Sequence, residues 1–453
     1  MTTDKAFKRV VRARMAKTGE RYSAARRTIL GTATADERRP SANIADDAAT
    51  PGYRLRGGLH PETATLANVL ANQGVVSGLT GQPLTEAAIL GIGGGLGAGY
   101  ILWEFKSHGG PVLTLGFRNL WQYPWITGWT GKTLERLRIE FDDHETGGAK
   151  TARAALDARL DAGQPVIAAV DLQSIGYWGL PVAMSGQWGH TVVVFGRDAG
   201  GAYLVDDRGQ APFHLSPDVL AAARGRIGTF KNRIIGLRTT PGPIPEDRLR
   251  TAIRAGLEDQ VAHLRAPSDS FSLPAWRKWA RLLTDTRNAK AWPRVFAGGH
   301  GLFGSLLGLL EGVDGDVGPG GGNLRELYAA SLDEAAVALD IPALNDAARA
   351  WRGVADQWEE LADAAVPPDL DGAAEAVDAV ETLHDAVRAG EPGRARVTAA
   401  SEITWAIRQR YVDEFPLSDE RVALIFADLG DRVAAIYAAE VDALEATARA
   451  IGQ

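Results

Sequence analysis

Two short segments of the chain hold the residue types that acid–base chemistry requires. His60 and Glu62 lie at the start of a predicted helix, and about 130 residues later His190 opens a predicted strand whose hairpin partner ends in Asp206 and Asp207. A carboxylate bonded to one nitrogen of an imidazole leaves the other nitrogen to take a proton near neutral pH. We expect His190 to be a general base held by Asp206, with Asp207 as the alternative partner, about 2.6–3.2 Å away. His60 and Glu62 complete the candidate catalytic set.

The same residues also have ordinary structural explanations. Pro61 suits the first position of a helix, and Glu62 in the first turn interacts favourably with the helix dipole. His60 is then a helix-entry residue and His190 a polar residue at a strand start. With Asp206, the two histidines and Glu62 would also offer a nitrogen and oxygen ligand set to a divalent metal. No spacing in the sequence fixes such a set, and we expect neither a metal nor a cofactor.

Aromatic residues stand near both segments and are candidates for substrate binding. They are Trp121, Trp125, Tyr177, Trp178 and Trp188. Proline and glycine interrupt any helix around the first two, which places them on a loop. Aromatic loops line ligand clefts, and they also close over hydrophobic cores. The positions of Tyr177, Trp178 and Trp188 around the glycine-containing approach to His190 favour a cleft.

The pattern of apolar residues predicts an α+β region that carries both segments. Helices are expected at 60–74, 84–92 and 152–163, each with three- and four-residue apolar spacing. Segments rich in Val, Ile and Tyr predict strands at 111–117, 164–171, 190–198, 201–207 and 232–238. A turn at 198–201 makes the third and fourth strands a hairpin. This hairpin places His190 and the two aspartates on neighbouring strands.

A proline-rich stretch at 240–246 marks the expected end of this region. Beyond it every segment repeats apolar residues with helical spacing, and Trp276, Trp279, Trp351 and Trp358 fit a helical core. The predicted organisation is a basic arm and linker at 1–50, an α+β domain at 51–240 and an all-α domain at 241–453. A sheet that drew strands from both sides of residue 241 would contradict it.

Composition narrows the function classes. The 453 residues carry a net charge of −7 and no cysteine, which excludes disulfides, thiolate metal sites and a thiol nucleophile. Residues 1–30 hold nine basic and two acidic residues, so this arm is expected to be partly helical and dispensable for the core fold. It offers a contact for nucleic acid, an acidic partner or the protein's own acidic body, of which the last is favoured. No signal peptide or membrane span is visible, so we expect a cytoplasmic protein without a membrane partner.

Two glycine-rich runs could be taken for nucleotide or anion sites. Gly93, Gly95 and Ala98 formally match a dinucleotide-binding fingerprint, but a helical pattern precedes them where the fingerprint needs a strand. Close packing of the backbone around a buried turn explains these glycines better. The second run leads into a helix with Arg325 in its first turn, which would suit an anion. A loop before an ordinary helix start is the preferred interpretation.

The order of these segments resembles a known family. HPETATLANVLANQGV, LTEAAILGIGGGLGAGYILWEF, GQWGHTVVVFGRD and AYLVDD are similar to the N-terminal domain of the butirosin biosynthesis protein H family, and PAWRKWARLL and GGGNLRELYAASLDEAA are similar to the helical domain that often follows it. The resemblance covers about residues 51–365. It implies a papain-like (cysteine-peptidase-like) α+β fold, and an activity that transfers an acyl group from a carrier protein to an aminoglycoside amine. It also implies that His190 and Asp206 are the base and its orienting acid.

The chain departs from the family at the nucleophile. The family opens this helix with His-Cys, whereas this chain has His60-Pro61, and proline offers neither a nucleophilic side chain nor an N–H. The hydroxyl of Thr63 is a weak substitute. Two hypotheses follow: an enzyme that forms, breaks or cyclises an acyl or amide bond by His-based acid–base chemistry, or an inactive scaffold that binds a metabolite, peptide or protein. The expected partner is a small-molecule or carrier-bound acyl substrate, and the sequence leaves a homo-oligomer open.

Overall fold

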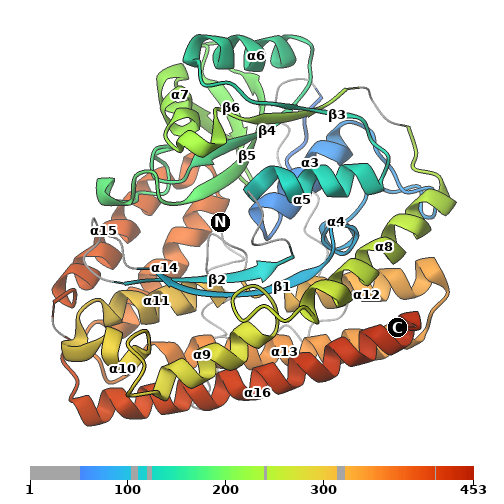
Figure 1. Cartoon of the computed structure of the whole chain (residues 1–453). Helices are drawn as coiled ribbons and strands as arrows, with labels where there is room; N and C mark the ends of the chain where they lie inside the picture. The colour runs from blue at the N-terminus through green and yellow to red at the C-terminus, as the bar shows by residue number, and fades with distance from the viewer. Residues whose placement is uncertain (1–51, 104–110, 120–124, 239–241, 314–321, 414) are drawn as a thin grey trace, which may run out of the picture. The chain divides into compact units, whose positions relative to one another are not determined.

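The α+β region is built on one sheet that lies entirely before residue 241. The computed structural model describes residues 52–453 except 104–110, 120–124, 239–241, 314–321 and 414 (Figure 1). The basic arm at 1–50 lies outside the described residues, as do Trp121 and the side chain of Trp125. The sheet contains β3 (Phe141–His144), β4 (Val166–Asp171), β5 (Gly189–Arg197), β6 (Tyr203–Asp206), β7 (Phe213–Leu215) and β8 (Ile234–Leu237).

The six strands do not follow their chain order across the sheet, but every neighbouring pair is antiparallel. The order is β3-β8-β4-β5-β6-β7. The predicted strands at 164–171, 190–198, 201–207 and 232–238 are confirmed, as is the hairpin that joins the middle two. β3 and β7 are short edge strands that apolar spacing did not reveal. The antiparallel sheet confirms the predicted α+β class.

Each face of the sheet is covered by a different set of helices. Side chains alternate between the faces of a strand, so Val193 and Val194 enter two separate cores. Helices α3 (Pro61–Asn72), α4 (Glu86–Ile92) and α5 (Trp125–Arg136) cover the face of Val193. Helices α6 (Ala149–Asp161) and α7 (Pro217–Gly225) cover the face of Val194. The second face also receives side chains from the helical region, which is described below.

A separate two-stranded hairpin explains the first glycine run. β1 (Leu96–Trp103) pairs with β2 (Val112–Arg118), which confirms the strand predicted at 111–117. α4 ends at Gly93, and Gly94 and Gly95 turn the chain with φ values of +102° and +62°, which side chains disfavour. A Cβ on Gly97 would lie 2.0 Å from the carbonyl oxygen of Arg118. The glycines therefore serve close backbone packing, as expected, and the element directly before them is helix α4, where a nucleotide fingerprint needs a strand.

The helical region follows and confirms the predicted all-α half. Its helices are α8 (Glu246–Leu264), α9 (Pro274–Thr284), α10 (Trp292–Val295), α11 (Leu302–Val313), α12 (Arg325–Leu339), α13 (Ala343–Ala365), α14 (Ala373–Arg388), α15 (Arg394–Arg410) and α16 (Asp419–Ile451). Trp276, Trp279, Trp351 and Trp358 are fully buried in its core, as predicted. No helix in the described part of the chain is long and apolar enough to cross a membrane.

The helical core includes the β1–β2 hairpin. Tyr100 and Phe117 pack among the buried tryptophans, and the ring centroids of Tyr100 and Trp279 are 5.5 Å apart. Figure 1 shows the hairpin lying along α11 and α9, above the long helix α16. Residues 50–453 form one compact unit. Residue 240 thus marks a change of secondary structure, and the division into two independent domains there stays a prediction.

Candidate functional site

His190 is hydrogen-bonded to Asp207. The His190 Nε2 atom and the Asp207 Oδ1 atom are 2.9 Å apart, and both side chains are almost fully buried. The predicted bond between His190 and Asp206 is wrong, and the alternative named for it, Asp207, is the partner. The histidine begins β5 and the acid directly follows β6, which is the placement that the sequence predicted for the pair.

A β-bulge decides which aspartate meets the histidine. Unbroken pairing outward from the turn at 198–201 would place Asp206 opposite Val194 and on the same face as His190. The register shifts between Val194 and Gly196, so that Asp206 lies opposite Val193 instead. A one-residue shift moves every following side chain to the other face of a strand. Asp207 therefore shares the face of His190, and Asp206 faces α3.

Four donors surround the Asp207 carboxylate. Besides His190, the Tyr177 hydroxyl donates at 2.9 Å, the Trp178 indole N–H at 3.1 Å and the Arg208 Nε–H at 3.1 Å. Burial by itself raises the pKa of Asp207, but the charges of His190 and Arg208 and the hydrogen bonds outweigh it and lower the pKa below its ordinary value. An ionised carboxylate only accepts, so His190 donates through Nε2–H and keeps Nδ1 as its basic nitrogen.

The predicted aromatic wall is divided by the structure. Tyr177 and Trp178 are buried and donate to Asp207, so they hold the acid, and their predicted substrate-binding role stays a prediction. The edge-on contact between the Trp178 and His190 rings, with centroids 6.0 Å apart, also restricts the imidazole. Trp188 is partly buried and packs on the core of the same face. Helix α5 begins at Trp125, so the loop predicted around this residue is wrong, whereas for Trp121 and Trp125 the substrate-binding role stays a prediction.

His60 caps the start of α3. Its Nδ1 accepts a hydrogen bond of 3.3 Å from the backbone N–H of Glu62, so the proton of the neutral ring is on Nε2. Burial lowers the pKa of His60 well below its ordinary value, and the charges of Arg118, Arg208 and His190 lower it further. His60 is therefore a neutral imidazole near neutral pH. Arg208, which donates to both Asp207 and the carbonyl oxygen of Leu59, connects the helix start to the His190–Asp207 pair.

The other residues of this helix start are already engaged. Glu62 forms an ion pair with Arg118 from the end of β2, and the Arg118 guanidinium also lies 5.2 Å from the ring centroid of Trp129. The Thr63 hydroxyl is buried and donates to Glu86 at 2.6 Å. Glu62 is therefore not a free base, and Thr63 is not placed as a substitute nucleophile.

The helix start is also poor in backbone donors. Pro61 is the first residue of α3 and has no N–H, and the N–H of Glu62 is taken by His60. A helix N-terminus stabilises an oxyanion through just these free groups. Any oxyanion here would need another donor, and His60 keeps an Nε2–H because its Nδ1 is the nitrogen that accepts from Glu62.

Asp206 connects the sheet to α3 on the opposite face. It accepts hydrogen bonds from the Tyr53 hydroxyl at 2.8 Å, the Asn68 side chain at 3.3 Å and the backbone N–H of Arg208 at 2.9 Å. Burial is the main cause that raises the pKa of Asp206 to about 6; the Tyr53 hydrogen bond opposes this increase and the charge of Asp207 adds to it. The role we infer for Asp206 is to position α3 against the sheet.

The separation of the two aspartates also bears on the metal alternative. Among the described residues, no group of three or more His, Asp or Glu side chains could hold a metal ion. His190 and His60 are each committed to a bond with a neighbour, through Nε2 and Nδ1 respectively. The nitrogen and oxygen ligand set considered for these residues is therefore not assembled here.

Three supporting residues were not predicted. Arg208 adopts a left-handed φ of +60°, and from there its side chain reaches both Asp207 and the carbonyl oxygen of Leu59 before α3. Glu86 accepts from the backbone N–H groups of Leu59 and His60, each at 2.9 Å. An arginine directly after an Asp-Asp pair was the one signal in the sequence. The roles of Glu86 and Tyr53 depend on contacts between distant segments.

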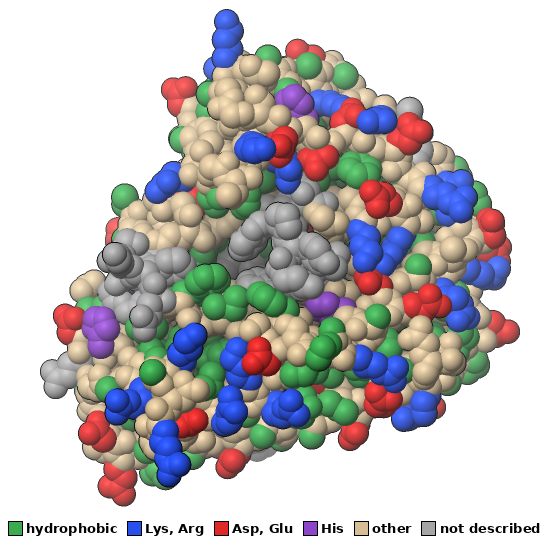
Figure 2. Space-filling view, viewed as in Figure 1, with side chains coloured by type: hydrophobic (Ala, Val, Ile, Leu, Met, Phe, Trp, Pro, Cys, Tyr) green, Lys and Arg blue, Asp and Glu red, His purple; other side chains and the backbone are tan. Residues whose placement is uncertain are grey.

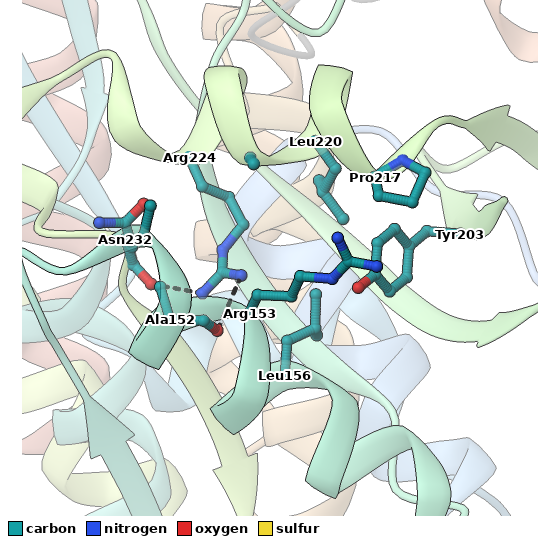
Figure 3. A pocket seen from close by; sticks show the side chains of 10 residues that line it. Ala152, Arg153, Leu156, Tyr203, Pro217, Leu220, Arg224 and Asn232 are labelled. Atoms are coloured by element: carbon teal, nitrogen blue, oxygen red, sulfur yellow. Dashed lines mark hydrogen bonds between the residues drawn. The ribbon is translucent and has the colours of Figure 1, made fainter. Parts of the chain in front are cut away.

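Two small cavities lie near the sheet, and one adjoins the site. A cavity of about 10 Å³ behind Asp207 is lined by Gly58, Trp178, Asp207, Arg208, His384, Val387 and Arg388. The other lies between α6 and α7, where Arg224 donates to the carbonyl oxygens of Ala152 and Asn232 (Figure 3). This second arginine ties backbone segments together and contacts no residue of the site. On the face shown in Figure 2 the surface is hollowed beside the β1–β2 hairpin, where hydrophobic side chains gather.

An α+β fold that sets a helix start against a strand-borne histidine and its acid is that of a papain-like protein. Residues 60–208 match the family described as butirosin biosynthesis protein H, N-terminal, and residues 218–392 match a domain of unknown function, DUF4872. Residues 60–208 therefore form an N-terminal domain of the butirosin biosynthesis protein H kind, in a chain without cysteine. No curated protein matches it. The second match begins within the α+β region, at α7, and ends just after α14.

Proposed function

We propose that this protein transfers an acyl group to an amine or to water in a single displacement, with His190 as general base. The observation that carries the proposal is the His190–Asp207 bond. Three further donors fix Asp207, and the imidazole presents Nδ1 as its remaining basic nitrogen. Such an orienting carboxylate holds the tautomer and stabilises the imidazolium that forms during proton transfer. Inheritance of the family layout without its thiol is consistent with this chemistry.

The steps balance without a covalent intermediate. His190 Nδ1 takes a proton from the attacking amine as its nitrogen bonds to the acyl carbon. The carbonyl oxygen gains negative charge and accepts a hydrogen bond from the Nε2–H of neutral His60. The bond from the acyl carbon to the leaving sulfur or oxygen then breaks, and the imidazolium returns its proton to that leaving group. Proline in place of the family's cysteine is compatible with this route, since no acyl-enzyme forms.

The hydrophobic surface beside the hairpin supports an acyl substrate. β2 presents Val112 and Thr114 on the strand face opposite the one that packs on the helical core, and it ends at Arg118. Arg118 in turn contacts Glu62 at the start of α3. This strand surface and the start of α3 are thus joined through Arg118, and we propose that an acyl chain lies along β2 toward the helix start.

Substitution of His190 tests the proposal. The probe reaction is transfer from a short-chain acyl thioester of N-acetylcysteamine to a primary amine, followed by mass spectrometry. His190→Ala is expected to lower the rate about 10²–10⁴-fold, whereas His144→Ala, at a partly buried histidine on β3, should leave it unchanged. Equal rates in the wild type and His190→Ala would overturn the proposal, as would an acyl adduct on the protein.

The inactive scaffold is the second candidate, and the helix start favours it. Pro61 and the capping by His60 remove two backbone donors that acyl transfer commonly uses. A scaffold would bind the thioester probe, detected as a rise in thermal stability, without turnover in the wild type. His190→Ala would then bind the probe as the wild type does.

A further inference from the structure

The helical region reaches the back of the proposed active site through α14. His384 on α14 is 5% exposed, and its ring meets the Trp178 ring edge-on, with centroids 5.4 Å apart. Trp178 in turn contacts the His190 ring and donates its indole N–H to Asp207. His384 and His190 thus both contact the Trp178 indole. The same indole donates to the Asp207 carboxylate, and this carboxylate accepts the hydrogen bond from His190.

A second contact fixes the chain just after Asp207. The backbone N–H of Gln210 donates to the carbonyl oxygen of Arg388 at 2.7 Å, and the N–H of Glu391 donates to that of Pro212 at 3.2 Å. Gly390, between them, has a φ of +73°, and a Cβ on it would lie 2.0 Å from the carbonyl oxygen of Ala211. The end of α14 therefore packs against residues 210–212 and bonds to them through the backbone. These contacts limit movement of the segment that carries Arg208.

His384 makes its contact as a neutral aromatic ring. Burial lowers its pKa to about 3, and the charges of Arg388 and Arg208 contribute. Near neutral pH it therefore brings no charge toward Asp207. An edge-on pair of aromatic rings is favoured beyond the area that it buries, and this favours one orientation of the indole. Trp178 therefore interacts with the His384 ring through its shape and packing more than through its titration.

We propose that His384 is a positioning residue for the His190–Asp207 pair, acting through Trp178, and that the helical region is thereby part of the active-site framework. This inference rests on the proposed role of the pair. Without His384 the indole would gain freedom, Asp207 would lose a fixed donor, and the His190 Nε2–H bond would open more often. The end of α14 acts on the same carboxylate from the other side, through the backbone after Arg208.

The test measures this bond directly and needs no substrate. Solvent exchange of the His190 Nε2–H proton is followed by NMR in the full-length protein with ¹⁵N-labelled histidine. His384→Phe keeps an aromatic ring of similar size, and His384→Leu keeps volume without the ring. Exchange should stay within two-fold of the wild type in the first variant and become at least ten-fold faster in the second. Equal exchange in the two variants, at equal global stability, would overturn the proposal.

A glycine pair provides an independent check of the α14 contact. Gly390→Ala should speed exchange of the same proton, because its methyl group collides with Ala211. Gly353→Ala is the matched control, since a Cβ there meets nothing within 4 Å in the middle of α13. No difference between the two alanine variants would contradict positioning through the end of α14. Since the readout is a proton bond and not turnover, a failure here is distinguishable from a failure of the acyl-transfer proposal.

Discussion

The molecule buries two carboxylates in similar surroundings, one in each half, and only one of them is part of a candidate active site. Glu440 on α16 is fully buried and bonded to Arg325 through both carboxylate oxygens, with Trp276 and Trp358 as indole donors. Asp207 likewise has an arginine and an indole donor. The difference is His190. A closed network of arginine and indole donors stabilises structure, whereas an imidazole adds a nitrogen that can exchange a proton near neutral pH.

This comparison also bears on Arg325, the arginine considered for an anion site. Arg325 lies in the first turn of α12, as predicted, but its guanidinium is committed to Glu440 and lies 5.1 Å from the ring centroid of Phe117. Its side chain is fully buried. An arginine at a helix start therefore indicates an anion site only when no carboxylate of the same chain reaches it.

The largest expected effect is on the free energy of unfolding, and it distinguishes Glu440 from Asp207. Glu440→Gln leaves the buried Arg325 guanidinium without a counter-charge and should cost about 3–5 kcal/mol of unfolding free energy. Glu445, on the same helix as Glu440, forms an exposed ion pair with Arg265. Glu445→Gln should therefore cost less than about 1 kcal/mol of unfolding free energy. Urea unfolding measures both variants. A loss of similar size in the two would show that the Glu440 network is not a closed structural core.

Asp207→Asn should act on catalysis more than on the core. An amide in place of the carboxylate can bond His190 in the other tautomer, which places the proton on Nδ1 and removes the base. We expect an acyl-transfer rate about 10²–10⁴-fold lower than that of the wild type. Asp157→Asn, at an acid on α6 that accepts from Tyr203, is the control and should keep the rate. Retained activity in Asp207→Asn would remove the distinction between the two carboxylates.

Asp206 should give the protein a characteristic dependence of stability on pH. Its pKa is about 6 in the folded protein and about 3.9 in an unfolded chain, so the folded state binds the proton more tightly. Its contribution is therefore present below about pH 4 and lost as the pH rises through about 6, by about 2–3 kcal/mol. Asp206→Asn should remove this decline in urea unfolding between pH 4 and 7. A decline that persists in the variant would assign it to other groups.

The smallest expected effect concerns the Tyr53–Asp206 hydrogen bond, which opposes the increase in the pKa of Asp206. Tyr53→Phe removes the hydroxyl that donates to Asp206 while keeping the ring stacked on Phe195, at a centroid distance of 4.1 Å. We expect a loss of about 1–2 kcal/mol at pH 7. The loss should be smaller at pH 4, where Asp206 is protonated. Tyr437→Phe on α16 is a suitable control, and a pH-independent loss in Tyr53→Phe would mean that packing explains it.

The sequence predicted the elements of the site better than their exact partners. Repeats of apolar residues located α3, β5 and β6, and the residue types at their ends located His190 and the two aspartates. The choice between Asp206 and Asp207 depended on the bulge at 194–196, which leaves no clear signal in HTVVVFGRD. One extra residue reverses the faces of a strand, so a correct strand still gave the wrong acid.

Long-range contacts account for what the sequence missed. Tyr177 and Trp178 were recognised as near His190, but local sequence does not distinguish an aromatic ring in a cleft from one that binds a buried acid. His384 is separated from Trp178 by more than 200 residues, and Glu86 reaches the loop before α3 from another helix. Such partners are brought together by tertiary packing, and the local pattern of a single sequence does not predict them.

The place of the β1–β2 hairpin has a consequence for how the chain is synthesised and folds. Tyr100 and Phe117 emerge from the ribosome early, yet the rings they pack against belong to α9 and α13, and the Trp292 indole that donates to the Tyr100 hydroxyl at 3.1 Å comes some 190 residues later. Contacts this distant in sequence slow folding, because long loops must close before they form. The early half must therefore wait, with apolar strand surface uncovered, until the late half is made.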